Sequence, residues 1–583
     1  MPTLEWIGKD KVVNHHLDVP YRVLERQYSF DENGKHDADN GSENMIIHGD
    51  NLEALKSLLP QYEGRVKCIY IDPPYNTGNE GWVYNDNVND PRIREWLNKT
   101  VGKEGEDLSR HDKWLCMMYP RLKLLQKLLA EDGAIFISID DTEYANLKLI
   151  CDEIFGSNCF VSNISWQRTY STRNDSKGIV NEVEHLLVYS KQPDWNPNKL
   201  PRTEEMNSKY KNPDNDRTLW RTDNAFAPGA ATHQGMVYAI QHPFTGKMLY
   251  PANGRCWTFG QDQMLEIMRG WCDYELRDLN DAHERAVVCG VADEDVRQGV
   301  QAIVLSEPLD ISAKKAQAVY ERGQWPRFFF TKGGKGGIAR KTYLENVGGK
   351  LPTNFWPFSE TGHTDEAKKE MLAIFDGKAT FDTPKPRRLL EFVLKVAGSE
   401  DALILDSFAG SGTTAHAVLN MNKADGGHRK FILVEMMDYA DSITAERVKR
   451  VIDGYGEGKN TVAGTGGSFS YYELGEPLMN GDVLNENVGV EKIREYVYFT
   501  DTKSRLPEPH PDEPYFMGVH VNSAYYFYYE REAVTTLNRK FLHTVKTQAD
   551  AYVIYADLCT LSDAELEKYH ITFKKIPRDI TKL

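Results

Sequence analysis

Apolar and polar positions repeat with two different periods along the first third of the chain. Short apolar runs, typical of buried strands, alternate with stretches in which leucines recur at the spacing of one helix face. A strand, a helix and a strand within so short a sequence predict a parallel crossover. The expected elements are a strand and turn at 44–51, a helix at 52–59, strands at 66–71, 134–139 and 184–189, and a helix at 114–129.

The same alternation returns later in the chain, after a long interruption. A strand at 402–406, a tight loop at 407–412, a helix from residue 413 and a strand at 431–435 follow one another. Between about 190 and 370 this rhythm is lost, and Asn, Pro, Asp, Lys and Trp accompany short aromatic strands. Because so long a segment exceeds the usual length of a loop, we expect it to be a domain of its own.

Five segments follow from this pattern. They are an N-terminal arm at 1–43, the first half of a main domain at 44–190, an inserted domain at 191–370, the second half of the main domain at 371–475, and a small α/β assembly domain at 476–583. The first is expected to be a polar arm because it ends in a loop-like stretch of Asp, Asn and Gly. The last contains tyrosine-rich strands, which are typical of a core or a subunit interface.

Composition and charge narrow the class of protein. With 583 residues, of which 40% are hydrophobic and 27% charged, the chain can form three or more globular domains. A net charge of −16 argues against non-specific coating of nucleic acid, so any DNA contact needs a local basic surface. The eight cysteines include no C-x-x-C pair, and neither a signal peptide nor a membrane span is evident, which favours the cytoplasm. Asp140-Asp141 are expected to cap a helix, and no metal site is predicted.

The strand at 66–71 ends in an unusual tetrapeptide, Asp72-Pro73-Pro74-Tyr75. The prolines stop the strand, so an acid, rigid carbonyls and an aromatic ring lie at a strand's carboxyl end, where ligands bind in open α/β sheets. Asp72 and the Pro73 carbonyl can accept hydrogen bonds from the two N–H groups of an exocyclic amine while Tyr75 stacks on the heterocycle. Held in this way, the nitrogen lone pair can turn toward an electrophile. The alternative is a plain strand-ending turn.

A second motif is the glycine loop before residue 413. Small residues let a ligand approach the backbone and the helix N-terminus, and Glu435 ends the next strand, where an acid often holds a ribose diol. Gly410, Gly412 and Ala415 also satisfy the loose G-x-G-x-x-[GA] dinucleotide fingerprint. An NAD or FAD oxidoreductase is therefore one alternative, and a catalytically idle DNA-binding subunit is another.

Together the two motifs resemble those of DNA amino-methyltransferases that use S-adenosylmethionine. Asp72 to Tyr75 match the catalytic D-P-P-Y motif, and Phe408, Gly410 and Gly412 match the F-x-G-x-G cofactor loop. The catalytic motif comes first along the chain, the insertion next and the cofactor loop last. This order resembles the circularly permuted beta group, and the resemblance implies a permuted Rossmann-like α/β fold with an inserted target-recognition domain. The cofactor-binding residues that the resemblance implies are Asp50, Lys385, Asp406, Phe408, Gly410, Ser411, Gly412, Thr413 and Glu435, with Lys385 near the methionine carboxylate.

Further segments are similar to modification subunits of Type III restriction-modification systems. They are 6–9, 48–51, 138–141 and 571–578. This resemblance implies methylation of adenine N6 in double-stranded DNA, a homodimer, and often a separate restriction subunit with helicase and nuclease activity. A solitary methyltransferase fits equally well. An acidic first residue in the catalytic motif resembles the adenine enzymes more than the N4-cytosine enzymes, which more often have serine there.

A glycine- and lysine-rich segment of the insertion is the candidate for DNA contact. Lys332, Lys335, Arg340 and Lys341 combine positive charge with bare backbone, which suits phosphate binding, although a flexible hairpin has the same composition. The recognition sequence does not follow from the amino-acid sequence, because base contacts depend on side-chain placement.

Overall fold

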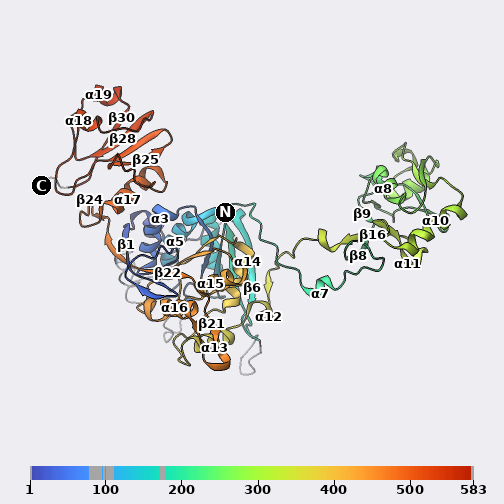
Figure 1. Cartoon of the computed structure of the whole chain (residues 1–583), viewed down its shortest axis with the longest axis horizontal. Coiled ribbons are helices and arrows are strands. Elements are labelled where there is room, and N and C mark those ends of the chain that lie inside the picture. Colours follow the sequence, from blue (N-terminus) through green and yellow to red (C-terminus); the bar gives the residue numbers. More distant parts are fainter. Residues whose placement is uncertain (1–2, 78–94, 96–98, 100–109, 171–178, 579–583) are drawn as a thin grey trace. The chain divides into compact units, whose positions relative to one another are not determined.

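The computed structural model describes residues 3–77, 95, 99, 110–170 and 179–578 (Figure 1). The chain divides into two compact units, one made of Met1–Asn198 and Pro352–Leu583 and the other of Lys199–Leu351. The second unit is narrower than the expected 191–370, because β17 (Phe355–Trp356) pairs with the main sheet of the first unit. The helices α12 (Phe358–Thr361) and α13 (Thr364–Ile374) likewise belong to the first unit.

An 11-stranded sheet forms the centre of the first unit, in the order β17-β6-β7-β5-β4-β18-β19-β3-β22-β1-β2. Its five central strands are parallel: β5 (Leu129–Ile139), β4 (Val66–Ile71), β18 (Leu403–Asp406), β19 (Lys430–Glu435) and β3 (Met45–His48). Their apolar runs are buried on both faces, as a covered parallel sheet requires. Ile69 of β4 lies opposite Leu405 of β18, so strands far apart in the sequence become neighbours.

The outer strands are partly antiparallel. β7 (Val183–Ser190) runs antiparallel to both β5 and β6 (Phe160–Gln167). At the other end β22 (Ser468–Pro477) pairs with β3 and with β1 (Arg22–Asp31), which forms a hairpin with β2 (Gly34–His36). Because β7 is reversed, its first residues lie at the same edge as the last residues of β5.

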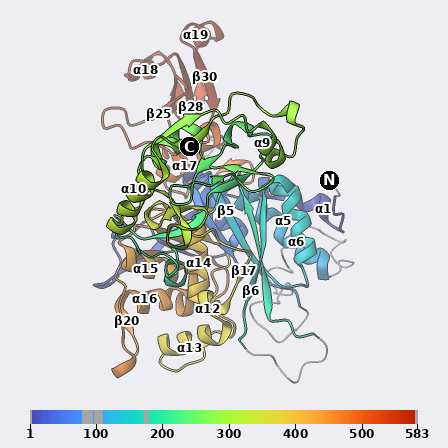
Figure 2. The same cartoon turned by 90° about the vertical axis from the view of Figure 1, so that its right-hand side faces the viewer.

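Helices cover both faces of this sheet (Figure 2). The helices α3 (Asn51–Tyr62), α5 (Arg110–Leu128) and α6 (Tyr144–Phe155) lie on one face, and α14 (Arg387–Ala397), α15 (Thr413–Asp425) and α16 (Glu446–Asp453) lie on the other. The leucines of α3 that the periodicity places on one side are buried in the large core shared with α5. Among the helices of the described residues, none has the length and apolar composition needed to cross a membrane.

The expected polar arm at 1–43 is not an arm in the structure. It contains two short helices, α1 (Lys9–Val12) and α2 (His15–Asp18), and the strands β1 and β2 of the main sheet. Trp6, Val12 and Val19 are buried in the core beside α5. The few apolar residues of this segment therefore dock on a surface made elsewhere in the chain, which a local reading of its polar composition does not reveal.

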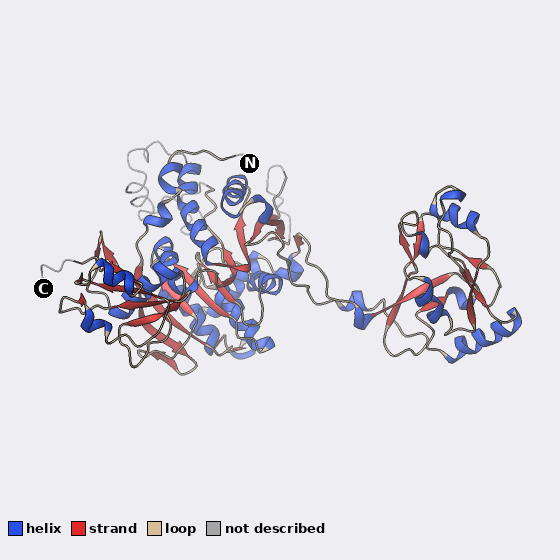
Figure 3. Cartoon of the chain, turned by 90° about the horizontal axis from the view of Figure 1, so that it is seen from above, coloured by secondary structure: helices blue, strands red, loops and turns tan. Residues whose placement is uncertain are grey.

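The unit Lys199–Leu351 has its own aromatic core, and Figure 3 shows its short helices and strands. Its strands are β8 (Trp220–Asn224), β9 (Phe226–Pro228), β10 (Ile240–Gln241), β11 (Met248–Leu249), β12 (Arg255–Trp257), β13 (Tyr274–Arg277), β14 (Ala302–Leu305), β15 (Phe328–Phe330) and β16 (Ile338–Tyr343). Its helices are α7 (Glu204–Asn207), α8 (Gln261–Met268), α9 (Ala282–Cys289), α10 (Leu309–Arg322) and α11 (Thr331–Gly334). Their tryptophans and phenylalanines pack together, as the aromatic strands of the sequence predict.

The C-terminal segment forms a small α/β arrangement. β25 (Phe516–His520), β26 (Ser523–Phe527), β28 (Ala551–Ala556) and β30 (Ile571–Lys575) make a four-stranded sheet. The helices α17 (Val490–Thr502), α18 (Arg539–Leu542) and α19 (Asp563–Lys568) accompany it. Tyr498, Tyr526 and Tyr529 are buried, so these tyrosines serve as core residues. The expected boundary at 476 falls inside β22, which the main sheet shares.

Candidate active site

The two sequence motifs meet at one edge of the central sheet. Asp72 follows β4 directly, and Asp406 ends the neighbouring parallel strand β18. Parallel neighbours present their carboxyl ends at the same edge, so the tetrapeptide and the glycine loop emerge side by side. The next strands in this direction, β19 and β3, deliver Glu435 and Asp50 to that edge.

Asp72 lies in a buried ionic cluster with Lys385. The Lys385 ammonium donates to both carboxylate oxygens of Asp72 at 2.8 Å and to the Tyr75 hydroxyl oxygen at 2.8 Å. The Tyr75 hydroxyl donates to Asp72 Oδ1 at 2.9 Å. The sequence prediction placed Lys385 near a cofactor carboxylate, whereas here its ammonium contacts the catalytic motif.

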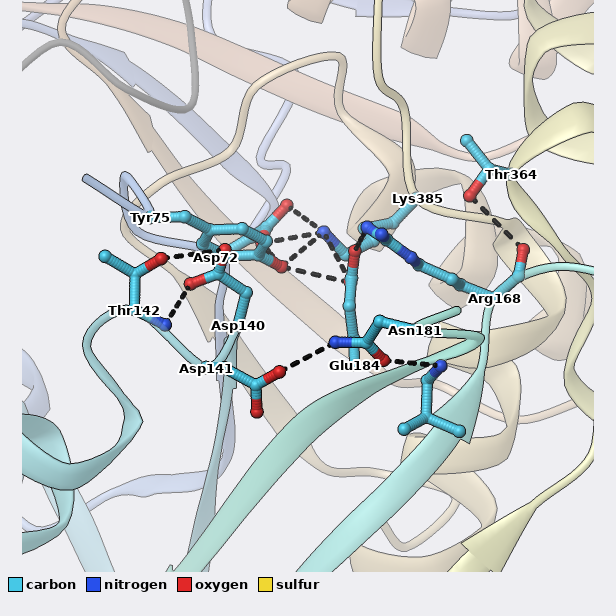
Figure 4. Close-up of polar contacts among 11 residues, drawn as sticks. Asp72, Tyr75, Asp140, Asp141, Thr142, Arg168, Asn181, Glu184, Thr364 and Lys385 are labelled. Carbon is cyan, nitrogen blue, oxygen red and sulfur yellow. Dashed lines mark hydrogen bonds and ion pairs between the residues drawn. The ribbon is translucent and has the colours of Figure 1, made fainter. Parts of the chain in front are cut away.

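Two further charged residues complete this cluster, and the sequence analysis did not identify them. Glu184, on β7, lies 3.2 Å from the Tyr75 hydroxyl and 3.6 Å from the Lys385 nitrogen. Arg168, just after β6, donates to Glu184 at 2.8 Å. Figure 4 shows Asp72, Tyr75, Glu184, Arg168 and Lys385 converging on one point. A signal was present, because Glu184 interrupts the start of an apolar strand, but only the antiparallel direction of β7 places it at this edge.

Burial and pairing have opposite effects on the charges of the cluster. Burial raises the pKa of Asp72 above its usual value, and the Lys385 ammonium opposes that change. Burial alone would lower the pKa of Lys385, but Asp72 and Glu184 together raise it, so the ammonium stays charged. For Glu184, burial favours a higher pKa, while Lys385 and Arg168 outweigh it and lower the pKa. Two carboxylates and two cations therefore neutralise one another in this cluster, of which Arg168 is the most exposed member.

The backbone of the motif is held from two sides. The indole N–H of Trp114 donates to the Pro74 carbonyl at 2.7 Å. Asn76, in a left-handed conformation with φ of 60°, donates to Glu143 at 2.5 Å. Glu143 is fully buried and also lies 2.7 Å from His111 Nδ1. These contacts fix the turn after Tyr75, while the predicted role of the buried Pro73 carbonyl as an amine acceptor stays a prediction.

The glycine loop has the backbone conformation that its sequence predicts. Gly410 and Gly412 have φ of 52° and 78°, in the left-handed region that glycine tolerates. A Cβ atom on Gly412 would lie 3.0 Å from the Thr444 carbonyl oxygen. The Gly410 N–H donates to Glu435 Oε2 at 2.7 Å, and the other Glu435 oxygen accepts from the Met437 N–H at 3.0 Å. Glu435 is thus in direct contact with the glycine loop, beside which the sequence analysis placed it.

Other residues of the predicted cofactor set stabilise the loop itself. Asp406 accepts from the Phe408 N–H at 3.0 Å and from the Thr414 hydroxyl at 2.5 Å. The hydroxyls of Ser411 and Thr413 accept from the buried Arg447 guanidinium at 2.9 and 2.7 Å. These side chains point into the protein and hold the loop in place.

Asp50 begins α3 as its N-cap. Its carboxylate accepts from the backbone N–H groups of Leu52 and Glu53 at 2.8 and 3.2 Å. Arg121 approaches the other oxygen at 3.4 Å. Asp140, just after β5, accepts from the Thr142 N–H and hydroxyl and so stabilises the turn before α6. The expected helix cap is not seen, because the N-cap of α6 is Glu143.

The four predicted DNA contacts do not share one environment. Lys332 and Lys335 are exposed on the turn after β15. Arg340 donates to Asp223 at 2.9 Å. Lys341 is fully buried and donates to Asp214 at 2.5 Å and to Asp216 at 2.6 Å. The prediction for Lys341 is therefore wrong, because its charge is neutralised inside the unit and cannot reach a phosphate.

The chain matches a known protein family over more than half of its length. The DNA methylase family model matches residues 66–446, which run from β4 through the glycine loop to the first residue of α16. Because this match covers more than half of the chain, the protein belongs to the DNA methylase family. The glycine loop alone also allowed an NAD or FAD oxidoreductase, and membership of this family favours a methyltransferase instead.

Several curated relatives extend the match. The chain is 34% identical over 434 residues to the Type III restriction-modification enzyme StyLTI Mod subunit of Salmonella typhimurium, covering 70% of this chain and 57% of that protein. It is 27% identical over 473 residues to the EcoPI Mod subunit of Escherichia phage P1, covering 74% and 63%. It is 30% identical over 399 residues to the Type II methyltransferase M.KpnI of Klebsiella pneumoniae, covering 67% and 80%. The chain thus spans about three fifths of the length of these Mod subunits.

Proposed function

We propose that this protein transfers a methyl group from S-adenosylmethionine to N6 of an adenine in double-stranded DNA. The observation that carries the proposal is the adjacency of the intact Asp72 to Tyr75 motif and the glycine loop on neighbouring strands. A buried carboxylate can accept a hydrogen bond from the N–H group of an amine, and the glycine loop can bring a methyl donor close to that amine. A paired amine cannot reach this buried edge, so the base must leave the duplex.

The residues present fit the cofactor. The left-handed conformations of Gly410 and Gly412 form a tight turn at the start of α15, and Glu435 lies beside it at the end of β19. When bound, S-adenosylmethionine would supply the electrophilic methyl group. Asp72 would orient the amine and accept its hydrogen bond, and Tyr75 would stack on the base.

We further propose that the protein is the modification subunit of a Type III-like restriction-modification system. Its similarity to the Mod subunits supports this assignment. A homodimer, a separate restriction subunit and a cytoplasmic location belong to the same proposal. A solitary methyltransferase is the second candidate, favoured by the similarity to M.KpnI.

Transfer of labelled methyl groups to unmethylated DNA tests the proposed function. The protein should incorporate label, and Asp72→Ala should reduce incorporation by at least about 100-fold, since a positioned polar group contributes on the order of 10²–10³ in rate. DNA binding by this variant should be nearly normal, because phosphate contacts elsewhere supply most of the affinity. No incorporation by the folded parent protein would refute the function and leave an idle DNA-binding subunit.

A further inference from the structure

The Lys385 ammonium occupies the acceptors that the proposed reaction assigns to the target amine. It donates to Asp72 Oδ1 and Oδ2, both at 2.8 Å. A third hydrogen bond, also 2.8 Å, goes to the Tyr75 hydroxyl. An amine nitrogen entering the site would need one of the Asp72 oxygens. The ammonium bridges both oxygens, so the target base must share this carboxylate with Lys385 or displace it.

Moving Lys385 away from Asp72 is costly unless another anion receives it. Its side chain is 9% exposed, and that of Asp72 is equally buried. A buried ammonium that loses its partner keeps its desolvation cost without compensation. The base itself is neutral, so it cannot replace the charge of Asp72 for the lysine.

Glu184 is placed to receive this charge. Its Oε2 atom lies 3.6 Å from the Lys385 nitrogen, compared with 2.8 Å for Asp72. Arg168 holds Glu184 in position through a 2.8 Å hydrogen bond, so the carboxylate does not need to move. The lysine side chain alone can close the remaining distance by rotation of its flexible stem.

We propose that Lys385 holds the place of the target amine in the DNA-free protein. When the amine binds Asp72, Glu184 receives the Lys385 ammonium. This inference rests on the proposed function. Glu184 is then a positioning residue for the reaction. It determines how readily the site exchanges its internal cation for a base that carries an amine. A target base without an amine would not require this exchange.

Base capture by Glu184→Gln tests the exchange. The recognition sequence is first mapped by strand-specific methylation sequencing of DNA from cells that express the parent protein. Two duplexes then carry adenine or purine, which lacks the amine, at the target position, with fluorescent 2-aminopurine as the neighbouring base. The rise in fluorescence on unstacking reports capture, and anisotropy reports total DNA binding.

Glu184→Gln should weaken capture of the adenine duplex about 10-fold and leave capture of the purine duplex unchanged, in line with the loss of one hydrogen bond to a charged group. Asp140→Asn is the matched control, because it removes a neighbouring, partly buried charge whose hydrogen bonds go to Thr142. It should affect both duplexes equally. If Glu184→Gln is insoluble, Glu184→Asp keeps the charge but withdraws it from Lys385 and should show the same selective loss.

Equal loss with adenine and purine would overturn the inference, since it would make Glu184 a purely structural residue. No loss with either duplex would overturn it as well. Both results leave the proposed function intact as long as the parent protein methylates DNA. A parent protein that transfers no methyl group fails at the earlier step, which distinguishes failure of the function from failure of the exchange.

Discussion

Asp406 shows how a motif residue can stabilise its own loop. Its carboxylate is 3% exposed and accepts hydrogen bonds from the backbone and side chain of its own loop. The sequence predicted its position at the strand end but assigned it to the cofactor. Side-chain direction depends on the packing around the loop, which no local pattern encodes. The contact between Lys385 and Asp72 could not be predicted for the same reason, because the two residues lie 313 positions apart in the sequence.

The pH dependence of stability should reveal the buried Asp406. Burial raises its pKa from 3.8 to about 7, so the folded protein holds this proton more tightly than the unfolded chain. The contribution is complete below about pH 4 and is lost as pH rises to about 7, amounting to roughly 4 kcal/mol at about 1.4 kcal/mol per pKa unit. In Asp406→Asn, the decline in stability between pH 5 and pH 8, measured by urea unfolding, should be smaller. An identical decline in both proteins would contradict the assignment.

At the scale of elements, the strands beside the motifs follow directly from the sequence. Their continuous apolar runs and the loops after them identify β4, β5, β18 and β19. The direction of β7 does not follow, because an apolar strand reads alike in a parallel or an antiparallel arrangement. This one reversal brings Glu184 to the site. The segment 1–43 differs from the prediction because β1 pairs with β22, more than 400 positions away.

The glycine loop offers a prediction with a control on the same helix. Gly412 precedes α15 and Gly426 follows it, with φ of 78° and 74°. Alanine at either position should cost about 1–2 kcal/mol of backbone strain. At Gly412 the new Cβ would also meet the Thr444 carbonyl, whereas at Gly426 it meets nothing within 4 Å. Calorimetry should therefore show weaker S-adenosylmethionine binding in Gly412→Ala and normal binding in Gly426→Ala. Equal affinities would mean that the loop does not contact the cofactor.

At the scale of the whole molecule, the proposed function requires an acidic chain to contact DNA through a local surface. The net charge is −16, and the compact unit Lys199–Leu351 lies in the sequence between the two segments of the sheet-containing unit. We expect this unit to select the DNA sequence. The sequence indicated its existence from the loss of strand–helix rhythm, but it could not separate surface lysines from buried ones.

Lys341 and the pair Lys332 and Lys335 should give opposite results. Lys341→Met leaves Asp214 and Asp216 without their buried cation and should destabilise the unit by about 3–5 kcal/mol in thermal or urea unfolding. Neutralising the exposed Lys332 and Lys335 with glutamine should leave stability unchanged and reduce the slope of log affinity against log salt by up to about 2. An unchanged slope would show that the turn does not contact phosphates.

Mass spectrometry of nucleosides tests the central claim most directly. Unmethylated double-stranded DNA is incubated with S-adenosylmethionine and either the parent protein or Asp72→Ala, then digested to nucleosides. The acidic first residue of the catalytic motif and the similarity to Mod subunits predict N6-methyladenine from the parent protein and none above background from the variant. Recovery of N4-methylcytosine would contradict the base assignment, and full activity in Asp72→Ala would contradict the mechanism.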